Sequence, residues 1–384
     1  MTIRARGWTA NASVDGGNVS RTITAVATIQ SFAGGGLGEA CNRVFSDTTA
    51  GCTNLKKIVI STPFTARGCI KLDGTSTDPT QLTGSPVIIG GTVEIKSTDS
   101  IGTAGTPIAR ADIGGACKVE GASWRTPCSA ADRVYATTIT TTPSFTPRPT
   151  MDFAYWYANA KPGPLHPCTS GALPGGKGFD KNTIYNGDND KIDLTPSAAT
   201  YDCQYWESGQ LVGQLGWNHT THVLTIKGSI FFDGDLEAED DAVLVNYQGK
   251  ATIYASGKLN EFKELWCAGG NGTNNCRSNI SNWDPTQNLL IFVTGGLETG
   301  DSEVIKMKKD GGGFQGALWG NRRCKFDDDI MVSAPILCDK LSIKEDSDWA
   351  SLWPWPSSLI TSVSGQVYTD PGGDFQILLS KQYG

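Results

Sequence analysis

The chain has 384 residues, of which 39% are apolar and 18% are charged; the charged share is below the usual quarter. A formal net charge of −7 excludes the basic surface with which nucleic-acid-binding proteins neutralise phosphates. No run of about 18 apolar residues predicts a membrane-spanning helix, and no signal peptide is visible. The 46 glycines and the many Thr, Ser, Asn and Asp residues predict an all-β protein rich in turns.

The N-terminal region predicts a β-hairpin. Residues 20–30, SRTITAVATIQ, alternate between apolar and polar side chains, as expected of a half-buried strand. Residues 2–10 supply a partner strand, with DGGN at 15–18 as the turn. The glycine-rich stretch at 33–38 then breaks the pattern.

From residue 56 the sequence becomes a series of short apolar strands separated by Gly or Asp-Gly. The phrases IKLDG, FFDGDL, YASGKL and CDKLSI repeat this pattern loosely along the chain. Such repetition is typical of coiled parallel strands whose inward side chains stack from one turn to the next. We therefore expect a β-solenoid, similar to a parallel β-helix, with long disulfide-stapled loop insertions. A β-sandwich is the alternative, although its strands usually run longer.

Residues 224–245, LTIKGSIFFDGDLEAEDDAVLV, illustrate the pattern. We interpret Gly228 and Asp233–Gly234 as corners of the solenoid, because a Cβ atom would be crowded there. The acidic run at 237–241 is interpreted as a solvated turn.

Residues 113–210 depart from the pattern and contain a Thr/Pro stretch and an aromatic segment, which indicates a loop-rich excursion. The sequence therefore divides into five parts: an N-terminal strand segment at 1–55, solenoid at 56–112, an insertion at 113–210, solenoid at 211–345, and a C-terminal cap or interface at 346–384.

Eleven cysteines lie mostly in sequence-adjacent pairs, and none has the spacing of a zinc site. We therefore predict disulfides and an extracellular or cell-surface location. Pairing by proximity gives Cys41–Cys52, Cys117–Cys128, Cys168–Cys203, Cys267–Cys276 and Cys324–Cys338. Cys69 is left as a free buried thiol.

No catalytic motif stands out, so no enzyme activity, cofactor or metal is predicted. The weak calcium candidates are Asp188, Asp190 and Asp193, whose carboxylates alternate along the chain but lack the Gly and distal Glu of an EF-hand loop. His219 and His222 lack a third metal ligand, and surface roles are favoured for them.

Several phrases resemble bacterial type IV pilus-associated surface proteins of the minor-pilin (PilX-like) type. These are VLTIKGSIFFDGDL, GKATIYASGKL, NLLIFVTGG, FQGALWGN and VSAPILCDKLSI, together with the opening IRARGWTANASVDGGNVSRTITAVATIQSF. The similarity extends over most of the chain except residues 120–200. It implies a β-helical C-terminal region and an accessory or tip role in a filament. The hydrophobic N-terminal helix of pilins is absent from this sequence, which is therefore expected to have lost an N-terminal signal or anchor.

These observations predict a non-enzymatic extracellular structural or adhesive subunit. Its expected partners are other filament subunits or cell-surface glycans, with no nucleic acid. Exposed aromatic side chains are candidates for a contact surface, and they are Phe153, Tyr155, Trp156, Tyr157, Trp353 and Trp355. Covering the flank or end of the solenoid is the favoured role for them. The competing functions are a secreted β-helical polysaccharide lyase or hydrolase and a phage-type carbohydrate-binding spike.

Overall fold

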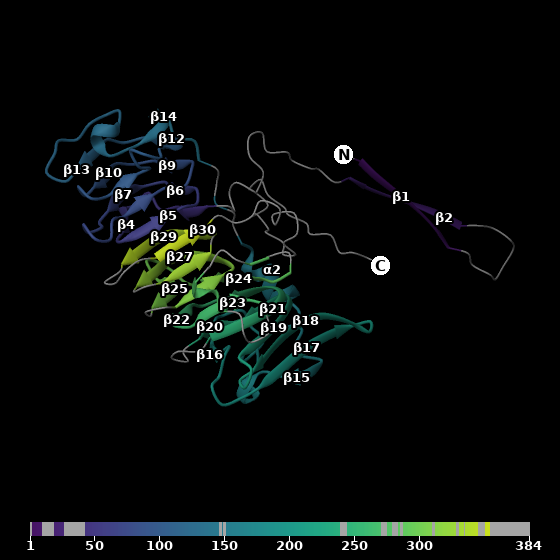
Figure 1. Ribbon diagram of the computed structural model, residues 1–384. Helices are drawn as coiled ribbons and strands as arrows, with labels where there is room; N and C mark the ends of the chain where they lie inside the picture. Colours follow the sequence, from purple (N-terminus) through teal and green to yellow (C-terminus); the bar gives the residue numbers. More distant parts are fainter. Residues whose placement is uncertain are drawn as a thin grey trace.

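The computed structural model describes two N-terminal strands and most of the chain from residue 43 to residue 353. Within 43–353 the described residues omit 146–147, 149–150, 239–243, 270–274, 279–282, 285–286, 309–311, 328–329, 334 and 345–349. The regular secondary structure of the described residues is almost all β-strand, and most of these strands pair in parallel (Figure 1). Its helical elements are α2 (Phe153–Asn159) and the 3-10 turns η1 (Ala130–Asp132), η2 (Pro174–Gly176) and η3 (Cys276–Ser278). None of the described helices has the length and apolar character needed to cross a membrane.

The N-terminal hairpin pairs as the sequence predicts. Strand β1 (Thr2–Thr9) is antiparallel to β2 (Val19–Val26), and their registers place Thr2 opposite Val26. The predicted turn at 15–18 and the last four residues of the predicted second strand lie outside the described residues.

The large sheet contains three columns of parallel strands, each column built from segments that recur along the chain. The first column contains, in spatial order, β19 (Val223–Phe232), β21 (Leu244–Ala255), β24 (Leu289–Thr294), β27 (Ala317–Asp327), β29 (Ile336–Lys344), β3 (Val44–Ser46), β6 (Phe64–Ala66), β9 (Val87–Ile89), β12 (Ile108–Ile113) and β14 (Ala136–Thr140). The second contains β16 (Asn189–Asp193), β20 (Gly234–Glu237), β22 (Leu259–Phe262), β25 (Glu303–Lys308), the later halves of β27 and β29, β4 (Cys52–Leu55), β7 (Cys69–Leu72), β10 (Val93–Ile95) and β13 (Cys117–Val119).

The third column begins with the first residues of β21. It continues through β23 (Leu265–Ala268), β26 (Gly313–Gln315), β28 (Met331–Ser333), β30 (Ala350–Trp353), β5 (Ile58–Ile60), β8 (Gln81–Leu82) and β11 (Ser100–Ile101). Strand β30 is the described part of the predicted C-terminal cap, and the rest of that segment lies outside the described residues.

The route of the chain through this stack is not sequential. The chain enters the sheet in the middle, at β3, and reaches one end at β12–β14 (Figure 1). It then passes to the opposite end, where β15 (Ser170–Ala172), β17 (Tyr201–Glu207) and β18 (Gln210–Asn218) pair antiparallel. From β19 it returns strand by strand to the middle, so that β29 and β30 meet β3, β4 and β5.

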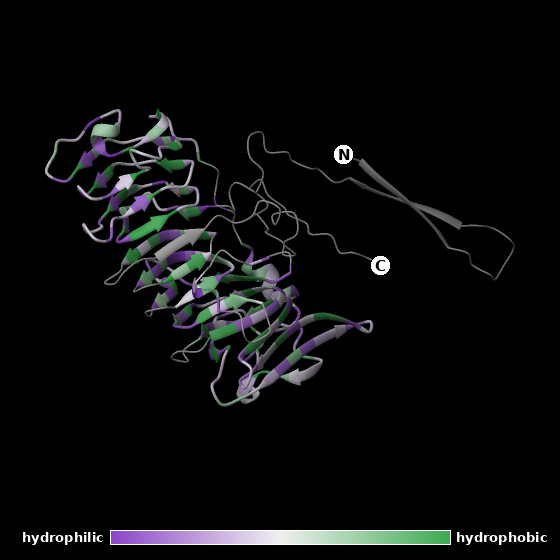
Figure 2. Cartoon of the chain, in the orientation of Figure 1, coloured by the Kyte–Doolittle hydropathy of each residue, from purple (hydrophilic) through white to green (hydrophobic). Residues whose placement is uncertain are grey.

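Inward-facing side chains form the core along the whole stack, and hydrophobic residues recur on strand after strand (Figure 2). In the first column one set of register partners is at most 2% exposed throughout, and its members are Ile230, Ile253, Phe292, Leu318, Ile336, Val44, Phe64, Val87 and Ala111. Aromatic rings fill the interior where the columns face each other. Phe262, Trp266 and Phe292 come from three different columns, and their ring centroids lie 4.9–6.1 Å apart.

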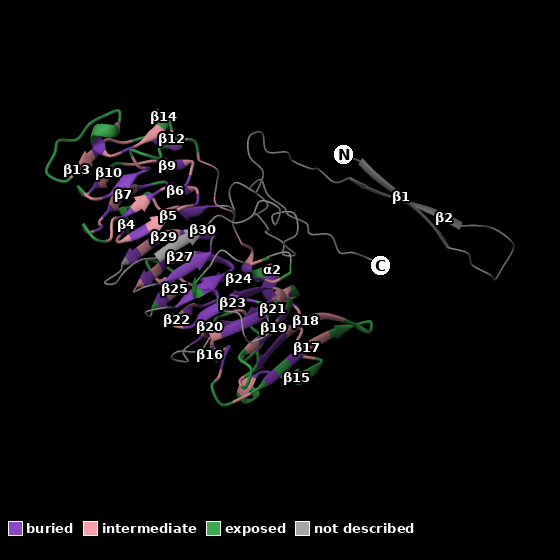
Figure 3. Ribbon diagram, in the orientation of Figure 1, coloured by how far each residue is buried: buried purple, intermediate pink, exposed green. Residues whose placement is uncertain are grey.

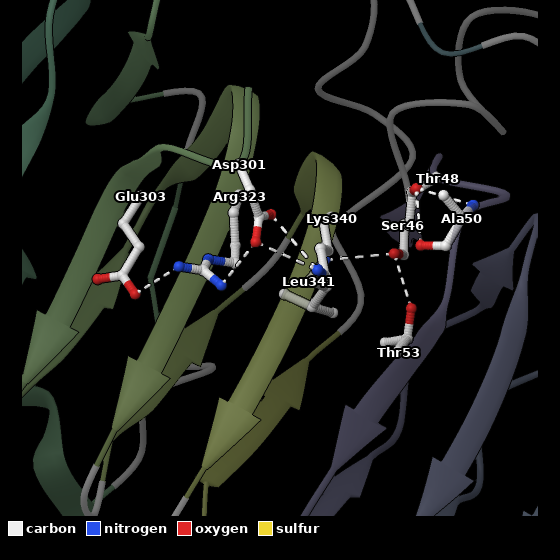
Figure 4. A network of polar contacts seen from close by, with 9 residues as sticks. All are labelled: Ser46, Thr48, Ala50, Thr53, Asp301, Glu303, Arg323, Lys340 and Leu341. Carbon is white, nitrogen blue, oxygen red and sulfur yellow. Dashed lines mark hydrogen bonds and ion pairs between the residues drawn. The ribbon is translucent and has the colours of Figure 1, made fainter. Parts of the chain in front are cut away.

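A polar network closes the junction between the last strands of the chain and the first (Figure 4). The buried Ser46 hydroxyl accepts hydrogen bonds from the Thr53 hydroxyl at 2.8 Å and from the backbone N–H of Leu341 at 3.2 Å. Nearby, Arg323 bonds the carboxylates of Asp301 and Glu303 at 3.0 and 2.9 Å. These contacts satisfy polar groups on both sides of a junction between residues almost 300 positions apart.

A second apolar row lies on the outer face of the first column. It consists of the residues next to the inward set, and its members are Phe231, Tyr254, Val293, Trp319, Leu337 and Phe45. We call this set the outer row. All six side chains are buried, and much of the strand surface in the middle of the stack has the colour of buried residues (Figure 3). The segment that returns from β14 to β15 covers them.

Helix α2 lies on the outer row. Its N-cap is Asp152, whose carboxylate accepts the N–H of Tyr155. Helical spacing places Phe153, Trp156 and Tyr157 on one face, where they contact the rings of Trp319, Tyr254 and Phe231 respectively. Trp156 stacks on Tyr254 with centroids 4.6 Å apart. The prediction of an exposed contact surface is therefore wrong for Phe153, Trp156 and Tyr157, which are buried on the flank of the sheet.

The corners predicted at Gly228 and Asp233–Gly234 have different outcomes. β19 ends before Asp233 and β20 begins at Gly234, so a break in the strand occurs there. At Gly228, by contrast, β19 continues without interruption. Its backbone bends through φ +80°, a conformation that glycine adopts without steric cost. Of the acidic run, Glu237 is the last residue of β20, and residues 239–241 lie outside the described residues.

Among the described residues five disulfides are present, and four of them match the predicted pairs: Cys117–Cys128, Cys168–Cys203, Cys267–Cys276 and Cys324–Cys338. The predicted Cys41–Cys52 pair and the free Cys69 are wrong. Cys52 is bonded to Cys69, because the two residues are register partners on the adjacent strands β4 and β7, with Cα atoms 4.4 Å apart. Cys41 lies outside the described residues.

The Cys52–Cys69 bond can be tested directly. A proteolytic digest under non-reducing conditions is expected to yield a peptide that links Cys52 to Cys69. Changing both residues to Ser is expected to lower the free energy of unfolding by about 3 kcal/mol, the value for a closed loop of roughly this size. A linked peptide joining Cys41 to Cys52 would contradict the assignment.

The junction between β29 and β3 should be a major source of stability. Ile336 is fully buried between Leu318 and Val44. Ile336→Ala is expected to lower the free energy of unfolding by about 2–5 kcal/mol, as measured by urea denaturation. Lys340→Ala on the same strand is the control, and because the ion pair of Lys340 is with the exposed Asp301 it should cost about 0–1 kcal/mol. Similar losses in both variants would argue against a packed junction.

The cover formed by α2 makes a second stability prediction. Trp156→Ala should lower the free energy of unfolding by about 3–5 kcal/mol, because the ring is buried against Tyr254. Asn159→Ala, at an exposed position of the same helix, should change it by about 0.5 kcal/mol or less. Thermal and urea unfolding of both variants provide the comparison, and a Trp156→Ala protein as stable as the control would show that the helix is not packed there.

Candidate functional site

The end of the stack formed by antiparallel strands carries a cavity. Strands β17 and β18 form a hairpin whose turn, Ser208–Gly209, has positive φ at both residues, the geometry of a two-residue hairpin loop. Strand β18 then pairs antiparallel with β19. In the turn between them, the Asn218 side-chain oxygen accepts the N–H groups of Thr220 and Thr221.

We call this cavity the end groove; its volume is about 460 Å³. It lies over β17, β18, β19 and the adjacent part of β21. Its lining residues are Thr200, Tyr201, Asp202, Gln214, Gly216, Trp217, Asn218, Thr221, Val223, Thr225 and Gln248. Hydroxyl and carboxamide groups predominate in this set.

Hydrogen bonds between side chains hold the polar groups of the end groove in place. The Asp202 carboxylate accepts the Gln214 amide at 2.9 Å and the Gln204 amide at 2.6 Å. Gln248 donates to the Thr225 hydroxyl at 2.9 Å. Each amide keeps further donor and acceptor capacity for a ligand.

Gly216 keeps the end groove open. It stands directly opposite Asp202 in the antiparallel ladder. A Cβ atom at position 216 would lie 2.8 Å from an Asp202 carboxylate oxygen, so a larger residue would displace that side chain.

Two buried aromatic residues lie on the core side of the same strands, on the face opposite to Asp202 and Gly216. The Trp217 ring is buried, donates its N–H to the Pro196 carbonyl at 3.0 Å and stacks on His222. The Tyr201 hydroxyl donates to the Leu194 carbonyl at 2.8 Å. Burial raises the pKa of this hydroxyl well above its ordinary value, so Tyr201 remains a neutral donor.

The two histidines near the end groove have structural contacts. His222 stacks on Trp217, and the Nδ1 of His219 lies 2.8 Å from the Thr200 hydroxyl. Within the described residues, the side chains placed closely enough to hold a metal ion together are three aspartates, and neither histidine is among them.

The predicted calcium candidates are separated in the structure. Asp190 forms an ion pair with Lys181, and Asp193 accepts the N–H of Thr195. Of the three, Asp188 joins a cluster with Asp180 and Asp233, two residues that were not predicted as metal ligands.

The remaining contact-surface candidates give a mixed picture. Tyr155 is partly buried and packs edge-on against Trp156, so it too belongs to the cover over the outer row. The Trp353 side chain and all of Trp355 lie outside the described residues. An exposed aromatic residue that the sequence analysis did not select is Trp206, near the tip of the β17–β18 hairpin.

The sequence analysis missed the end groove because its lining residues meet only through strand pairing. The sequence of 214–225 does indicate that these residues share a face. On each side of the turn, the lining residues are spaced by two, as expected for one face of a strand. They are Gln214, Gly216 and Asn218 before the turn and Thr221, Val223 and Thr225 after it. Two strands with small polar residues on one face predict a polar surface, but the pairing register decides whether the residues form a cavity.

Comparison of the chain with protein-family models, with curated proteins and with solved structures finds no match.

Proposed function

We propose that this protein is a non-enzymatic, extracellular, adhesive subunit that forms part of a surface filament of the minor-pilin type and binds glycans in the end groove. The observation that carries the adhesive role is the lining of the groove. Carboxamides and hydroxyls held by their own hydrogen bonds match the hydroxyl groups of a sugar.

The proposal includes a β-solenoid architecture. Support comes from the parallel pairing, in which strands return to three columns and inward residues stack on their register partners. A β-sandwich would instead place two sheets face to face, with antiparallel neighbours and Greek-key connections. A rod of this kind has little exposed apolar surface along its length, which suits a structural component.

An extracellular location is supported by the five disulfides, since such bonds persist in oxidising compartments. A filament role draws on the resemblance of the repeated phrases to minor-pilin-type proteins. The arrangement of the stack fits it as well, because β3 and β30 both lie near the middle and the end groove is at one end. A subunit attached to the filament near the middle of its stack would leave the end groove free to bind a ligand.

The main competing function is a polysaccharide hydrolase or lyase, which would need paired carboxylates, or acidic and basic groups together, along a groove. Charges do occupy neighbouring strands of one outward face, at Glu303, Arg323 and Lys340. They pair with one another and with Asp301, away from the end groove. The groove lining holds one carboxylate, Asp202, already engaged by two amides. These features favour binding over cleavage.

The groove proposal can be tested on an array of immobilised oligosaccharides. The wild-type protein is expected to bind a subset of the glycans. A Gln214→Ala/Gln248→Ala variant should bind the same glycans about 5- to 100-fold more weakly, because it lacks two amide hydrogen-bonding groups. Gln210→Ala, at the exposed tip of the same hairpin and outside the groove, serves as the matched control and should bind like the wild type.

Two results would overturn the proposal. One is array binding that the double variant retains in full, or no binding by the wild type at all. The other is release of reducing ends or of unsaturated sugars from the bound glycans, which would identify a hydrolase or a lyase instead.

A further inference from the structure

Three carboxylates converge beside the corner that follows β19. Each of Asp180, Asp188 and Asp233 offers one oxygen, and the three oxygens all lie within 4.8 Å of one another. Asp180 and Asp188 belong to the loop between η2 and β16, whereas Asp233 joins β19 to β20. The cluster therefore connects an irregular loop to the regular part of the sheet.

Asp233 is fully buried, and only one of its two carboxylate oxygens has a partner. Its Oδ2 accepts the backbone N–H groups of Asn186 and Gly187, both at 3.0 Å. Its Oδ1 is buried without any hydrogen-bond partner. A buried carboxylate oxygen in this state is energetically unfavourable unless a cation or a donor occupies the space beside it.

Asp188 repeats the same arrangement. Its Oδ2 accepts the Asn182 amide at 2.6 Å, and its Oδ1 is also buried without a hydrogen-bond partner. Asp180 accepts the Asn182 N–H on Oδ1 and the Tyr157 hydroxyl on Oδ2. Two of the three carboxylates thus each contribute a buried oxygen that no protein group satisfies.

The lysines near the cluster are engaged elsewhere. Lys181 pairs with Asp190, Lys177 donates to the Lys191 carbonyl, and Lys191 pairs with Glu237. Within the described part of the chain, the ion pairs include none to Asp180, Asp188 or Asp233. Three neighbouring negative charges in a largely buried setting repel one another, and a bound cation would remove that repulsion.

We infer that Asp180, Asp188 and Asp233 form a calcium site that fastens the 178–189 loop to the β19–β20 corner. Carboxylate oxygens are the ligands that Ca²⁺ prefers, with coordination completed by carbonyls or water. The cluster contains no sulfur or imidazole ligand, which disfavours zinc. The bound ion would also stabilise the cover over the outer row, since Tyr157 of α2 bonds Asp180 and packs on Phe231.

Terbium luminescence and thermal unfolding of the intact chain test the site. Terbium is a substitute for calcium, and the rings of Tyr157 and Tyr185, 5.2 Å apart beside the cluster, can sensitise its emission. We expect emission that Ca²⁺ displaces, a dissociation constant at or below about 1 mM as in extracellular calcium modules, and a higher Tm in Ca²⁺ than in EDTA.

Variants separate this site from general effects of charge. Asp233→Asn keeps the side-chain shape and an oxygen for the Asn186 and Gly187 N–H groups, and should weaken Ca²⁺ binding by about tenfold or more, because affinity depends on the number of charged ligands. Asp188→Asn, in the loop, should act in the same direction without disturbing the strand. Asp190→Asn is the control, since Asp190 is an exposed neighbour outside the cluster, and it should bind Ca²⁺ within about twofold of the wild type.

The inference fails if Ca²⁺ changes neither emission nor Tm, or if Asp190→Asn weakens binding as much as the two cluster variants. Equal stabilisation by Mg²⁺ would also overturn the assignment to calcium. The glycan-binding proposal is independent of these outcomes, because the end groove and the acidic cluster have no lining residue in common.

Discussion

The fold depends on one long-range pairing, between β29 and β3. β29 lies near the end of the described chain, and β3 is the first strand of the large sheet; the two are parallel. Ile336 stands beside Val44 in the first column and Ile343 beside Leu55 in the second, so residues nearly 300 positions apart are neighbours in two hydrophobic rows. Without this contact, the part of the stack built from β3 to β14 and the part built from β15 to β30 would each expose an unpaired strand edge in the middle of the protein. Such edges promote association with other chains. Because loop closure precedes its formation, we expect this junction to form late in folding.

The same pairing explains the outer row and its cover. The chain moves away from the junction between β3 and β14 and returns to it only between β19 and β30, so the segment after β14 must travel along the stack to reach β15. It does so over the first column, where Arg148 contacts the ring of Trp319 and α2 lies on Trp319, Tyr254 and Phe231. Strands beneath this segment are apolar on both faces. Farther along the column the same outward position is occupied by Thr65, Ile88 and Asp112, which are also buried, so polar residues enter this row without its becoming exposed.

Sequence reasoning succeeded where the information is local. Strand length, turn residues and the four disulfides between nearby cysteines all follow from short stretches of chain. It failed where register decides the outcome. Cys52 bonds Cys69 because the two lie side by side on neighbouring strands, and nothing within either segment indicates this. The burial of Trp156 had a recognisable signal, since the strand phrases IFF, IYA, IFV and ALW contain adjacent apolar residues that an uncovered solenoid would expose. The end groove and the acidic cluster join residues from separate elements, which composition and spacing cannot bring together.

Both candidate binding sites adjoin β19, and the change in strand pairing there accounts for this. Along the parallel columns, inward side chains fill the core, and the outer face is either covered by α2 or occupied by charges that pair with each other. At β19 the parallel neighbour on one side is β21 and the antiparallel neighbour on the other is β18, so the hairpin departs from the column and leaves polar side chains without neighbours from a further turn. The loop that enters β16 must meet the β19–β20 corner at the same place, and it brings carboxylates into contact with the buried Asp233. Both candidate sites therefore lie where the repeat ends, because the change in strand pairing there brings polar side chains and carboxylates together without a further parallel strand to cover them.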